Sequence, residues 1–426
     1  MTRRRVVVTG VGLVTPLGAG VELNWERMLR GESGVGPITR FDVSTMDVRI
    51  AAEVRPLPAV PEDASAPHLG IHSRFALVAG REAWVDAGLA DARIDRARAG
   101  VFLGSGKGIS ELEWLVEAVC ASRKGNEPTH YPAFLRAGLT SFLAARRVEE
   151  DYAMSAGRLA AAVGATGPHW VCITACAAGN HAIGEAYEAI LHGEAEILLA
   201  GGTHSQIDLM SLSGYSMLGA LSPSNDEPHK ASRPFDRRRN GFILGEGAGI
   251  MVLEEYEHAR RRGAHIRAEV CGYGNTADSH RVTDPRPDGL GAENAMRIAL
   301  EDAAVAPDAI GYINAHGTST TQNDKMESEA IKRIFGPKGE APPVSSTKSM
   351  IGHLIAAAGA VEAIVCVRAL ETQTLPPTIN YENPDPECDL DYLPGEPREA
   401  QVEYAMNNSF GFGGQNIVTV FQRFSG

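Results

Sequence analysis

Apolar runs of strand character alternate along this chain with alanine-rich runs of helical character. The run RVVVTGVG at 5–12 is followed by the helical segment 75–89 and by a second strand-like run, GVFLGSG, at 100–106. Further along, the helical run at 295–305 leads to the strand-like IGYINA at 310–315. Strands that alternate with helices are typical of α/β proteins with mainly parallel sheets, and we predict that class here.

The same order of strand, turn and helix occurs twice. The unit of a strand followed by glycines at 5–12 has a counterpart at 266–274, and the strand, polar turn and small-residue helix at 171–190 have a counterpart at 343–367. This repetition favours duplication, although any α/β protein repeats such units. The duplication predicts an N-terminal half at 1–262, a cap insertion within it at roughly 108–165, and a C-terminal half at 263–426.

The composition is that of a globular protein with ample chain for a large core. Of the 426 residues, 44% are hydrophobic and 22% are charged, which suits one very large domain or two fused ones. The formal net charge of −13 argues against a nucleic-acid surface, because such a surface needs a basic patch. We expect no nucleic-acid partner.

Cysteine usage and hydropathy bear on the cellular compartment. The six cysteines include no CxxC pair, so we expect neither a disulfide framework nor a structural zinc site, and a reducing compartment. The longest apolar run, at 354–367, is too short to span a membrane and contains Glu362. We therefore expect a cytoplasmic protein that does not bind membranes.

Four reactive side chains stand in specific surroundings: Cys176 in TACAAG, His316 in NAHGTST, and Lys348 and His353 in SSTKSMIGH. Cys176 lies between an apolar strand and a helix rich in small residues, where backbone N–H groups and the helix dipole favour a thiolate. A thiol, two imidazoles and an ammonium are the groups needed to take an acyl chain onto sulfur and form a carbon–carbon bond. The alternatives are a packing cysteine and structural histidines; no metal-binding spacing is present.

Lys348 stands in a segment expected to be buried, and a buried ammonium needs a partner. Glu362 lies on the helix that follows, and Asp324 and Glu327 stand one turn apart after the HGTST run. All three carboxylates are candidates for a charge network with Lys348. A purely structural salt bridge is the alternative interpretation.

Five motifs in this order resemble one enzyme family. They are TACAAG, RPFDRRRNGFILGEGAG, NAHGTST, SSTKSMIGH followed by AAAGAVE, and NSFGFGG near the C-terminus. Together the motifs resemble those of the β-ketoacyl-acyl carrier protein synthases, and are most similar to the type II branch of fatty-acid synthesis and the related polyketide ketosynthases. The resemblance covers nearly the whole chain. It implies a thiolase-like α/β fold of two duplicated halves in five α-β-α-β-α layers, working as a dimer.

The resemblance also implies a role for each motif residue. Cys176 would be the nucleophile that accepts the acyl chain, His316 and His353 would support decarboxylation of a malonyl thioester, and Lys348 would hold the charge network with Glu362. The oxyanion hole would consist of the backbone N–H groups of Cys176 and Phe412. The residues expected to bind phosphopantetheine or substrate are Thr318, Thr320, Thr283, Phe410, Phe412, Tyr215 and Lys107. No metal and no cofactor of the protein's own is expected.

The family resemblance predicts an acyl carrier protein as partner, and a homodimer or a heterodimer with a related ketosynthase-like subunit. The chain departs from the family pattern at Lys107, where relatives carry an apolar residue in the acyl pocket, and at an apparent insertion at 134–152. The usual basic docking cluster is also absent. The arginines and lysine that could replace it are Arg123, Lys124, Arg146, Arg147 and Arg237 to Arg239.

Two other functions stay open at the level of sequence. A non-catalytic subunit that shapes the acyl pocket of a partner would resemble this family but lack the nucleophile, whereas Cys176 is present. A thiolase dependent on coenzyme A would carry a second cysteine near the C-terminus, and this chain has none after Cys388. A decarboxylating condensing enzyme is the favoured interpretation, and the departures at Lys107 and 134–152 favour an unusual acyl substrate.

Overall fold

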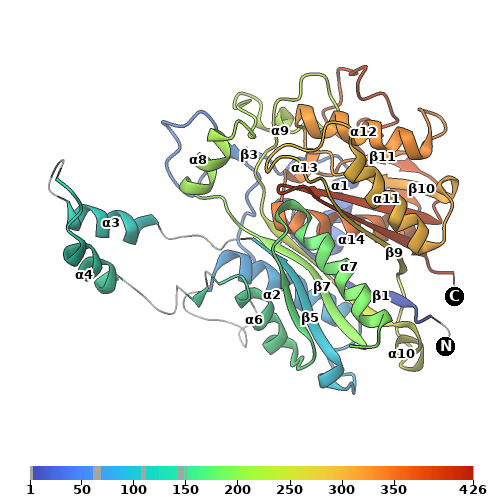
Figure 1. The fold of residues 1–426 in the computed structure, drawn as a ribbon. Helices are drawn as coiled ribbons and strands as arrows, with labels where there is room; N and C mark the ends of the chain where they lie inside the picture. The colour runs from blue at the N-terminus through green and yellow to red at the C-terminus, as the bar shows by residue number, and fades with distance from the viewer. Residues whose placement is uncertain are drawn as a thin grey trace.

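The computed structural model describes residues 3–60, 69–106, 112–123, 125, 127–141, 148–149 and 151–425. Within these residues, ten strands form one hydrogen-bonded path that consists of two similar sheets, and an eleventh, short strand pairs beside this path (Figure 1). The strands of the first sheet are β1 (Val6–Thr15), β5 (Ala99–Ser105), β6 (His169–Cys172), β7 (Ile197–His204) and β8 (Gly247–Glu255), with the short β2 (Gly18–Ala19) beside β1. Those of the second are β9 (Ala268–Ala277), β10 (Ile310–Asn314), β11 (Val344–Ser345), β14 (Tyr404–Gly411) and β15 (Gln415–Arg423).

The two sheets have the same strand order. The first runs β6-β5-β7-β8-β1 and the second runs β11-β10-β14-β15-β9, so each follows the order third, second, fourth, fifth, first along its own half of the chain. Corresponding pairs also agree in direction: β5 is parallel to β6 and β7 as β10 is to β11 and β14, and the other two pairs of each sheet are antiparallel. The predicted fold class, with duplicated halves, is confirmed.

The expectation of mainly parallel sheets is wrong, because each sheet contains two parallel and two antiparallel strand pairs. Only three residues connect β14 to β15, and a connection of that length permits only an antiparallel hairpin. A short antiparallel contact also joins the halves, where Val6–Val8 of β1 pair with residues 268–270 of β9. The strand periodicity in the sequence could not reveal these directions, since it is the same in both kinds of sheet.

Helices separate and cover the two sheets in layers (Figure 1). Between the sheets lie α7 (Ala178–Leu191), which packs on β5 and β7, and α14 (Ala358–Thr372), which packs on β14 and β8. One outer face is covered by α2 (Ile71–Asp86) with α6 (Met154–Val163), and the other by α11 (Leu290–Ala303) with α12 (Thr321–Phe335). The shorter helices are α1 (Val21–Leu29), α8 (Leu209–Met217), α9 (Pro228–Ala231), α10 (Tyr256–Arg261) and α13 (Lys348–Ile351).

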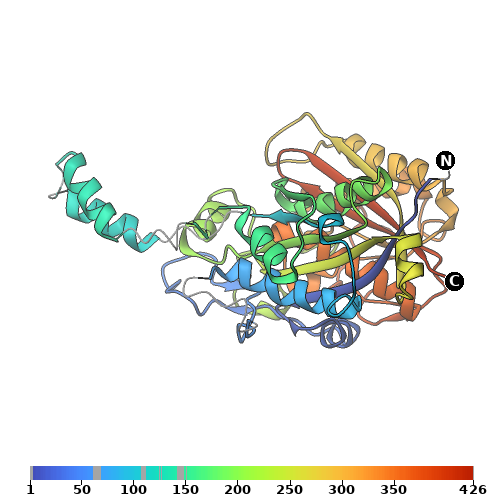
Figure 2. The ribbon, with the colours of Figure 1, turned by 90° about the horizontal axis from the view of Figure 1, so that it is seen from below.

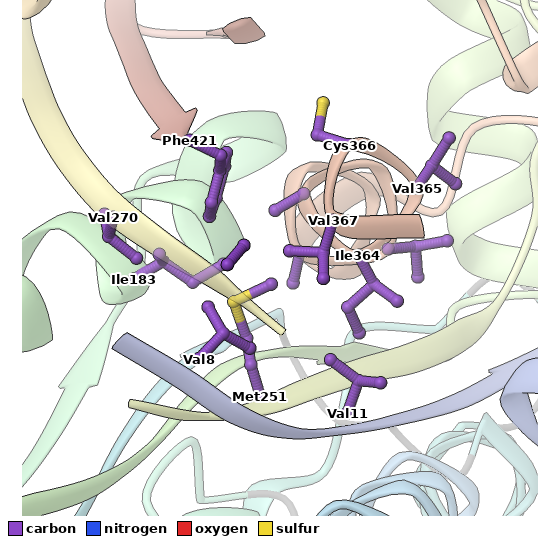
Figure 3. Close-up of a cluster of buried hydrophobic side chains, with 14 of the residues drawn as sticks. Val8, Val11, Ile183, Met251, Val270, Ile364, Val365, Cys366, Val367 and Phe421 are labelled. Carbon is purple, nitrogen blue, oxygen red and sulfur yellow. The ribbon is translucent and has the colours of Figure 1, made fainter. Parts of the chain in front are cut away.

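The largest apolar core surrounds α14 and α7 between the sheets. Figure 3 shows Ile364 and Val367 of α14 facing Val11 of β1 and Met251 of β8, with Val270 and Phe421 closing the cluster from the second sheet. All of these side chains are buried. Burial on nearly every side fits the alanine and glycine content of α14, whereas α7 keeps a half-buried polar stripe of His181, Glu185 and Glu188.

The region predicted as a cap contains three described helices. The helices α3 (Leu112–Ser122) and α4 (Tyr131–Ser141) pack against each other and stand well away from the body in both views (Figures 1 and 2), whereas α6 packs on α2. Several apolar side chains of the α3–α4 pair are exposed, among them Tyr131, Leu135 and Leu139. In this single chain, α3 and α4 do not lie over the sheets.

Candidate active site

Cys176 lies in a strained turn between β6 and α7. It is the middle residue of a three-residue 3-10 turn, Ala175–Ala177, whose first residue adopts a left-handed φ of 47°. The end of β14 approaches this turn closely, because a Cβ on Gly411 would lie 2.8 Å from the Thr174 carbonyl oxygen and 3.3 Å from the Cys176 nitrogen. A glycine at 411 therefore lets the next residue, Phe412, come up to the thiol.

Burial controls the protonation of the Cys176 thiol. Desolvation raises the pKa of Cys176 to about 11, while a hydrogen bond from the Phe412 backbone N–H, the charge of Lys348 and the backbone N–H of Cys176 itself oppose the rise. The sequence-based expectation of a thiolate at the helix start is thus outweighed, and the resting group is a thiol. The N–H groups of Phe412 and Cys176 both act on the sulfur and therefore lie beside the reactive atom.

Two carboxylates hold the loop that carries His316. This residue follows β10, and Glu327 accepts hydrogen bonds from the backbone N–H groups of His316 and Gly317, both at 2.8 Å. Asp324 accepts from the N–H groups of Thr318, at 3.0 Å, and Ser319, at 3.2 Å. Both carboxylates belong to the first half of α12, so that helix fixes the His316 backbone.

The His353 backbone is joined to the segment that follows the RPFDRRRNG run. Its N–H donates to the Ile243 carbonyl at 2.7 Å, and its carbonyl accepts from the Gly245 N–H at 2.9 Å. The ring then meets that of His316 edge to face, with centroids 5.3 Å apart and planes at 82°. Loops distant in sequence thus bring the two imidazoles together.

Both imidazoles are neutral. Burial holds the pKa of His316 and that of His353 well below the usual value of 6.5, and the nearby Lys348 ammonium lowers both further. Among the described residues, Nδ1 of His316 and both ring nitrogens of His353 lack a hydrogen-bond partner. A neutral imidazole can donate one hydrogen bond, so the pair is suited to an oxygen that develops negative charge.

Lys348 and Glu362 form a fully buried ion pair. Lys348 Nζ donates to Glu362 Oε1 at 2.5 Å, and neither side chain is more than 1% exposed. Burial raises the pKa of Glu362 to about 7 against the opposing pull of the ammonium. Of the three candidate carboxylates, the structure thus pairs Lys348 with Glu362, while Asp324 and Glu327 bind the His316 loop.

The RPFDRRRNGF run supports that loop from the other side. The Phe235 N–H donates to Asp324 at 2.8 Å, and the Arg239 guanidinium lies 3.7 Å from Asp324 and 2.5 Å from Asp385. The Arg239 side chain is 1% exposed, so its suggested role in carrier docking is wrong. Arg237, Arg238 and Arg123 are exposed, whereas Lys124, Arg146 and Arg147 lie outside the described residues.

A cavity of ≈ 280 Å³ brings most of the predicted residues together. Its wall includes the nucleophile candidate and both imidazoles. The other predicted residues that line it are Thr318, Thr320, Thr283, Phe410 and Phe412. Thr318 and Thr320 share a hydrogen bond between their hydroxyls at 2.9 Å, and Phe410 packs against the His316 ring with centroids 5.7 Å apart.

Tyr215 lines a second cavity of ≈ 390 Å³ instead. Ile355 and Phe412 line both cavities, so the two spaces are neighbours with these residues between them. Lys107, predicted to reach the acyl pocket, lies outside the described residues. The second cavity contains residues that sequence reasoning missed, notably His204 and Ile355. The one available signal was the position of His204 at the end of an apolar strand, where α/β proteins assemble sites.

Three further observations concern metal ions, membranes and cysteines. In the ranges that the structure describes, no group of three or more His, Cys, Asp and Glu side chains is arranged to hold a metal ion. No helix in the same ranges is long and apolar enough to cross a membrane. The six cysteines, all described, are free thiols.

Fold and site together define an acyl-transferring enzyme of the thiolase fold. Family models for the N-terminal and C-terminal domains of β-ketoacyl synthase match residues 3–259 and 267–382. Because these models cover most of the chain, it belongs to the β-ketoacyl synthase family, as the motifs indicated.

Relatives that match the chain along its full length support the same family assignment. The chain is 43% identical to 3-oxoacyl-[acyl-carrier-protein] synthase 2 of Coxiella burnetii, covering 99% of both chains, and 42% identical to the protein of that name from Synechocystis, covering 100% and 99%. Among solved structures, a β-ketoacyl synthase from Burkholderia phymatum superposes with a TM-score of 0.88 at 36% identity, covering 99% of this chain and all of that one. A type II polyketide ketosynthase, solved with its acyl-carrier protein and a bound hexaketide, gives 0.87 at 35% identity over the full length of both.

Proposed function

We propose that this chain is a β-ketoacyl-acyl carrier protein synthase that condenses a cysteine-bound acyl chain with a malonyl thioester, releasing carbon dioxide. The observation that carries the proposal is the convergence of Cys176, His316 and His353 on one cavity. The relatives named 3-oxoacyl-[acyl-carrier-protein] synthase 2, which match the chain from end to end, support the same reaction.

The first half-reaction transfers the acyl chain to sulfur. The Cys176 sulfur attacks the carbonyl carbon of the incoming thioester, the bond from that carbon to the carrier sulfur breaks, and the carrier leaves as a thiol with the proton from Cys176. The N–H groups of Phe412 and Cys176 stabilise the oxyanion of the tetrahedral intermediate. Because the resting pKa of Cys176 is about 11, the proton must leave as the attack proceeds.

The second half-reaction forms the carbon–carbon bond. Loss of carbon dioxide from the malonyl group leaves its electron pair in an enolate, whose oxygen accepts hydrogen bonds from the neutral rings of His316 and His353. The enolate carbon attacks the acyl carbonyl on Cys176, and collapse of the intermediate expels the Cys176 thiolate. The Lys348–Glu362 pair, buried behind the thiol, keeps a positive charge near that leaving sulfur.

The proposed reaction uses no cofactor held by the enzyme itself, because the acyl groups arrive on the phosphopantetheine of a carrier protein. The hydrogen-bonded hydroxyls of Thr318 and Thr320 and the exposed Thr283 line the first cavity and offer polar contacts for that arm. Phe412, at the junction of the two cavities, separates the arm from the space beyond Cys176.

We further propose an acyl carrier protein as partner and a dimeric enzyme in the cytoplasm, either a homodimer or a heterodimer with a related subunit. A similar ketosynthase has been solved with its carrier protein, and another, at 26% identity and a TM-score of 0.80 over 99% of this chain and 98% of that one, with its chain length factor. The exposed Arg237 and Arg238 are candidates for contact with an acidic carrier.

The test is intact-mass detection of the acyl enzyme, followed by analysis of the product with malonyl-carrier protein. We expect a mass increase of one acyl group on Cys176, then release of a chain two carbons longer that carries a 3-keto group. The Cys176→Ser variant should capture no acyl group and form no condensation product. Full condensation by that variant would exclude the proposed mechanism.

A further inference from the structure

His204 is a buried side chain without a polar partner beside the active site. His204 is the last residue of strand β7 and is 1% exposed. Neither of its ring nitrogens has a hydrogen-bond partner within the part of the chain that the structure describes. His204 lines the second cavity, which shares the lining residues Ile355 and Phe412 with the first. A structural histidine in a protein core is normally hydrogen-bonded, so His204 needs another explanation.

The position of the His204 ring is fixed by its neighbours. Gly106 lies against it so closely that a Cβ at 106 would come within 2.2 Å of His204 Nδ1. Burial lowers the pKa of His204 to about 3, and the nearby His72 adds to this effect. The ring is therefore neutral and presents one N–H donor and one acceptor nitrogen.

Other hydrogen-bonding groups line the same cavity. They belong to the lining residues Ser105, Thr174, Tyr215 and Gln206, and the Tyr215 hydroxyl donates to the Gln206 amide oxygen at 3.3 Å. Apolar lining comes from Ile173, Ala175, Ile355 and Ala356. Thr174 and Ala175 directly precede Cys176, so this mixed surface begins at the thiol and extends to His204.

We propose that the second cavity receives the acyl chain and that His204 selects chains bearing a carbonyl or hydroxyl oxygen. This inference rests on the proposed function and names the substrate class of the same site. A saturated alkyl chain in this space would leave both nitrogens of His204 dry and unpaired, which is unfavourable. An oxygen substituent accepts the imidazole N–H, and a hydroxyl can alternatively donate to the other nitrogen.

The experiment compares acyl pantetheine thioesters of one chain length. The panel contains the saturated chain and chains with a ketone or a hydroxyl at carbon 3, 5 or 7, and the rate of Cys176 acylation is followed by intact mass. In the native enzyme we expect at least one oxygenated chain to react roughly tenfold to a hundredfold faster than the saturated chain, as an unpaired buried group implies. A faster ketone identifies a donating ring nitrogen, whereas a hydroxyl chain that reacts faster than the matching ketone identifies an accepting one.

Two variants at His204 complete the test. His204→Leu should reduce the preference to about onefold by slowing the oxygenated chain, and His204→Gln, which keeps a donor and an acceptor, should retain part of it. Thermal unfolding shows whether each variant is folded. If a variant is not folded, the rate ratio of oxygenated to saturated chain in the native enzyme still tests the inference. The inference about His204 is overturned if the saturated chain reacts as fast as, or faster than, every oxygenated chain. It is also overturned if the rate ratio of oxygenated to saturated chain is unchanged in His204→Leu. Neither result affects the proposed function. Absence of acylation by every thioester overturns the proposed function as well.

Discussion

Ala175 and Ile355 adopt the same left-handed backbone conformation, with φ of 47° and 44°, at the start of the two 3-10 turns that precede α7 and α14. The two residues occupy equivalent positions in the duplicated halves. The residue that follows is Cys176 in one half and Ala356 in the other. The strained turn is therefore a property of the repeated fold, and only one copy of it carries a thiol.

Replacing Ala175 with glycine tests this strain. A left-handed conformation costs an L-residue with a side chain about 1–2 kcal/mol, and glycine removes that cost. Glycine also adds chain entropy to the unfolded state, which opposes part of the gain. The net effect of Ala175→Gly should be a free energy of unfolding higher by up to about 1 kcal/mol. The matched control, Ala182→Gly in the interior of α7, should lower it by about 1 kcal/mol. Urea unfolding measures both, and equal losses in the two variants would contradict the assignment of strain to Ala175.

Replacing Arg239 should destabilise the protein far more than replacing its neighbour Arg238. The Arg239 guanidinium is buried between Asp324 and the half-buried Asp385, so Arg239→Met leaves the buried Asp324 carboxylate uncompensated and should cost about 3–5 kcal/mol of stability. Arg238→Met removes an exposed side chain and should leave the unfolding midpoint unchanged. Denaturant unfolding of the pair decides, and similar effects in both variants would disprove the structural role of Arg239.

The Lys348–Glu362 pair can be tested by a double-mutant cycle. At pH 8, Lys348→Met should cost about 3–5 kcal/mol, because it leaves the Glu362 carboxylate buried and unpaired, and the double variant Lys348→Met/Glu362→Gln should recover most of that loss. The cost should be smaller at pH 6. A carboxyl whose folded-state pKa lies above its unfolded value of 4.5 makes the protein less stable as the pH rises toward the folded-state pKa. That pKa is about 7 for Glu362 in the native protein, and loss of the Lys348 ammonium raises it further, so the variant continues to lose stability at a pH where the native protein no longer does.

The raised pKa of Cys176 predicts how alkylation depends on pH. The rate of iodoacetamide reaction at Cys176, followed by peptide mass to separate it from the exposed Cys120, should keep rising with pH toward about 11, because only the thiolate reacts. Lys348 lowers the pKa of Cys176 and Glu362 raises it. At pH 8, Lys348→Met should therefore slow the reaction and Glu362→Gln should accelerate it. A plateau near pH 7 in the native enzyme would contradict the buried-thiol description.

The sequence was most informative where residue type and local order carry the chemistry. Cys176 after an apolar strand, and His316 in a glycine-and-hydroxyl turn, were recognisable because strand ends and turns are local features. The duplicated halves were visible for the same reason. Strand directions were not, since a hairpin such as β14–β15 and a parallel pair share the same alternation of side chains.

The partners of buried charges required the folded chain. From the residues alone, Glu362, Asp324 and Glu327 were all candidates for Lys348, and the family resemblance favoured Glu362. Only Glu362 reaches Lys348, while the other two bind backbone N–H groups of the His316 loop. The helix start argued for a thiolate at Cys176, but the degree of burial, which raises its pKa, is a property of the packed structure.

By itself, the sequence determined the fold class, the family and the reactive groups, because these depend on residue type, periodicity and motif order. The tertiary structure decided which groups face one another, how far each is withdrawn from water, and that a third buried imidazole, His204, lines the space beyond Cys176. The physical reason is that hydrogen bonding and desolvation act between segments up to hundreds of residues apart, and no local pattern records those distances.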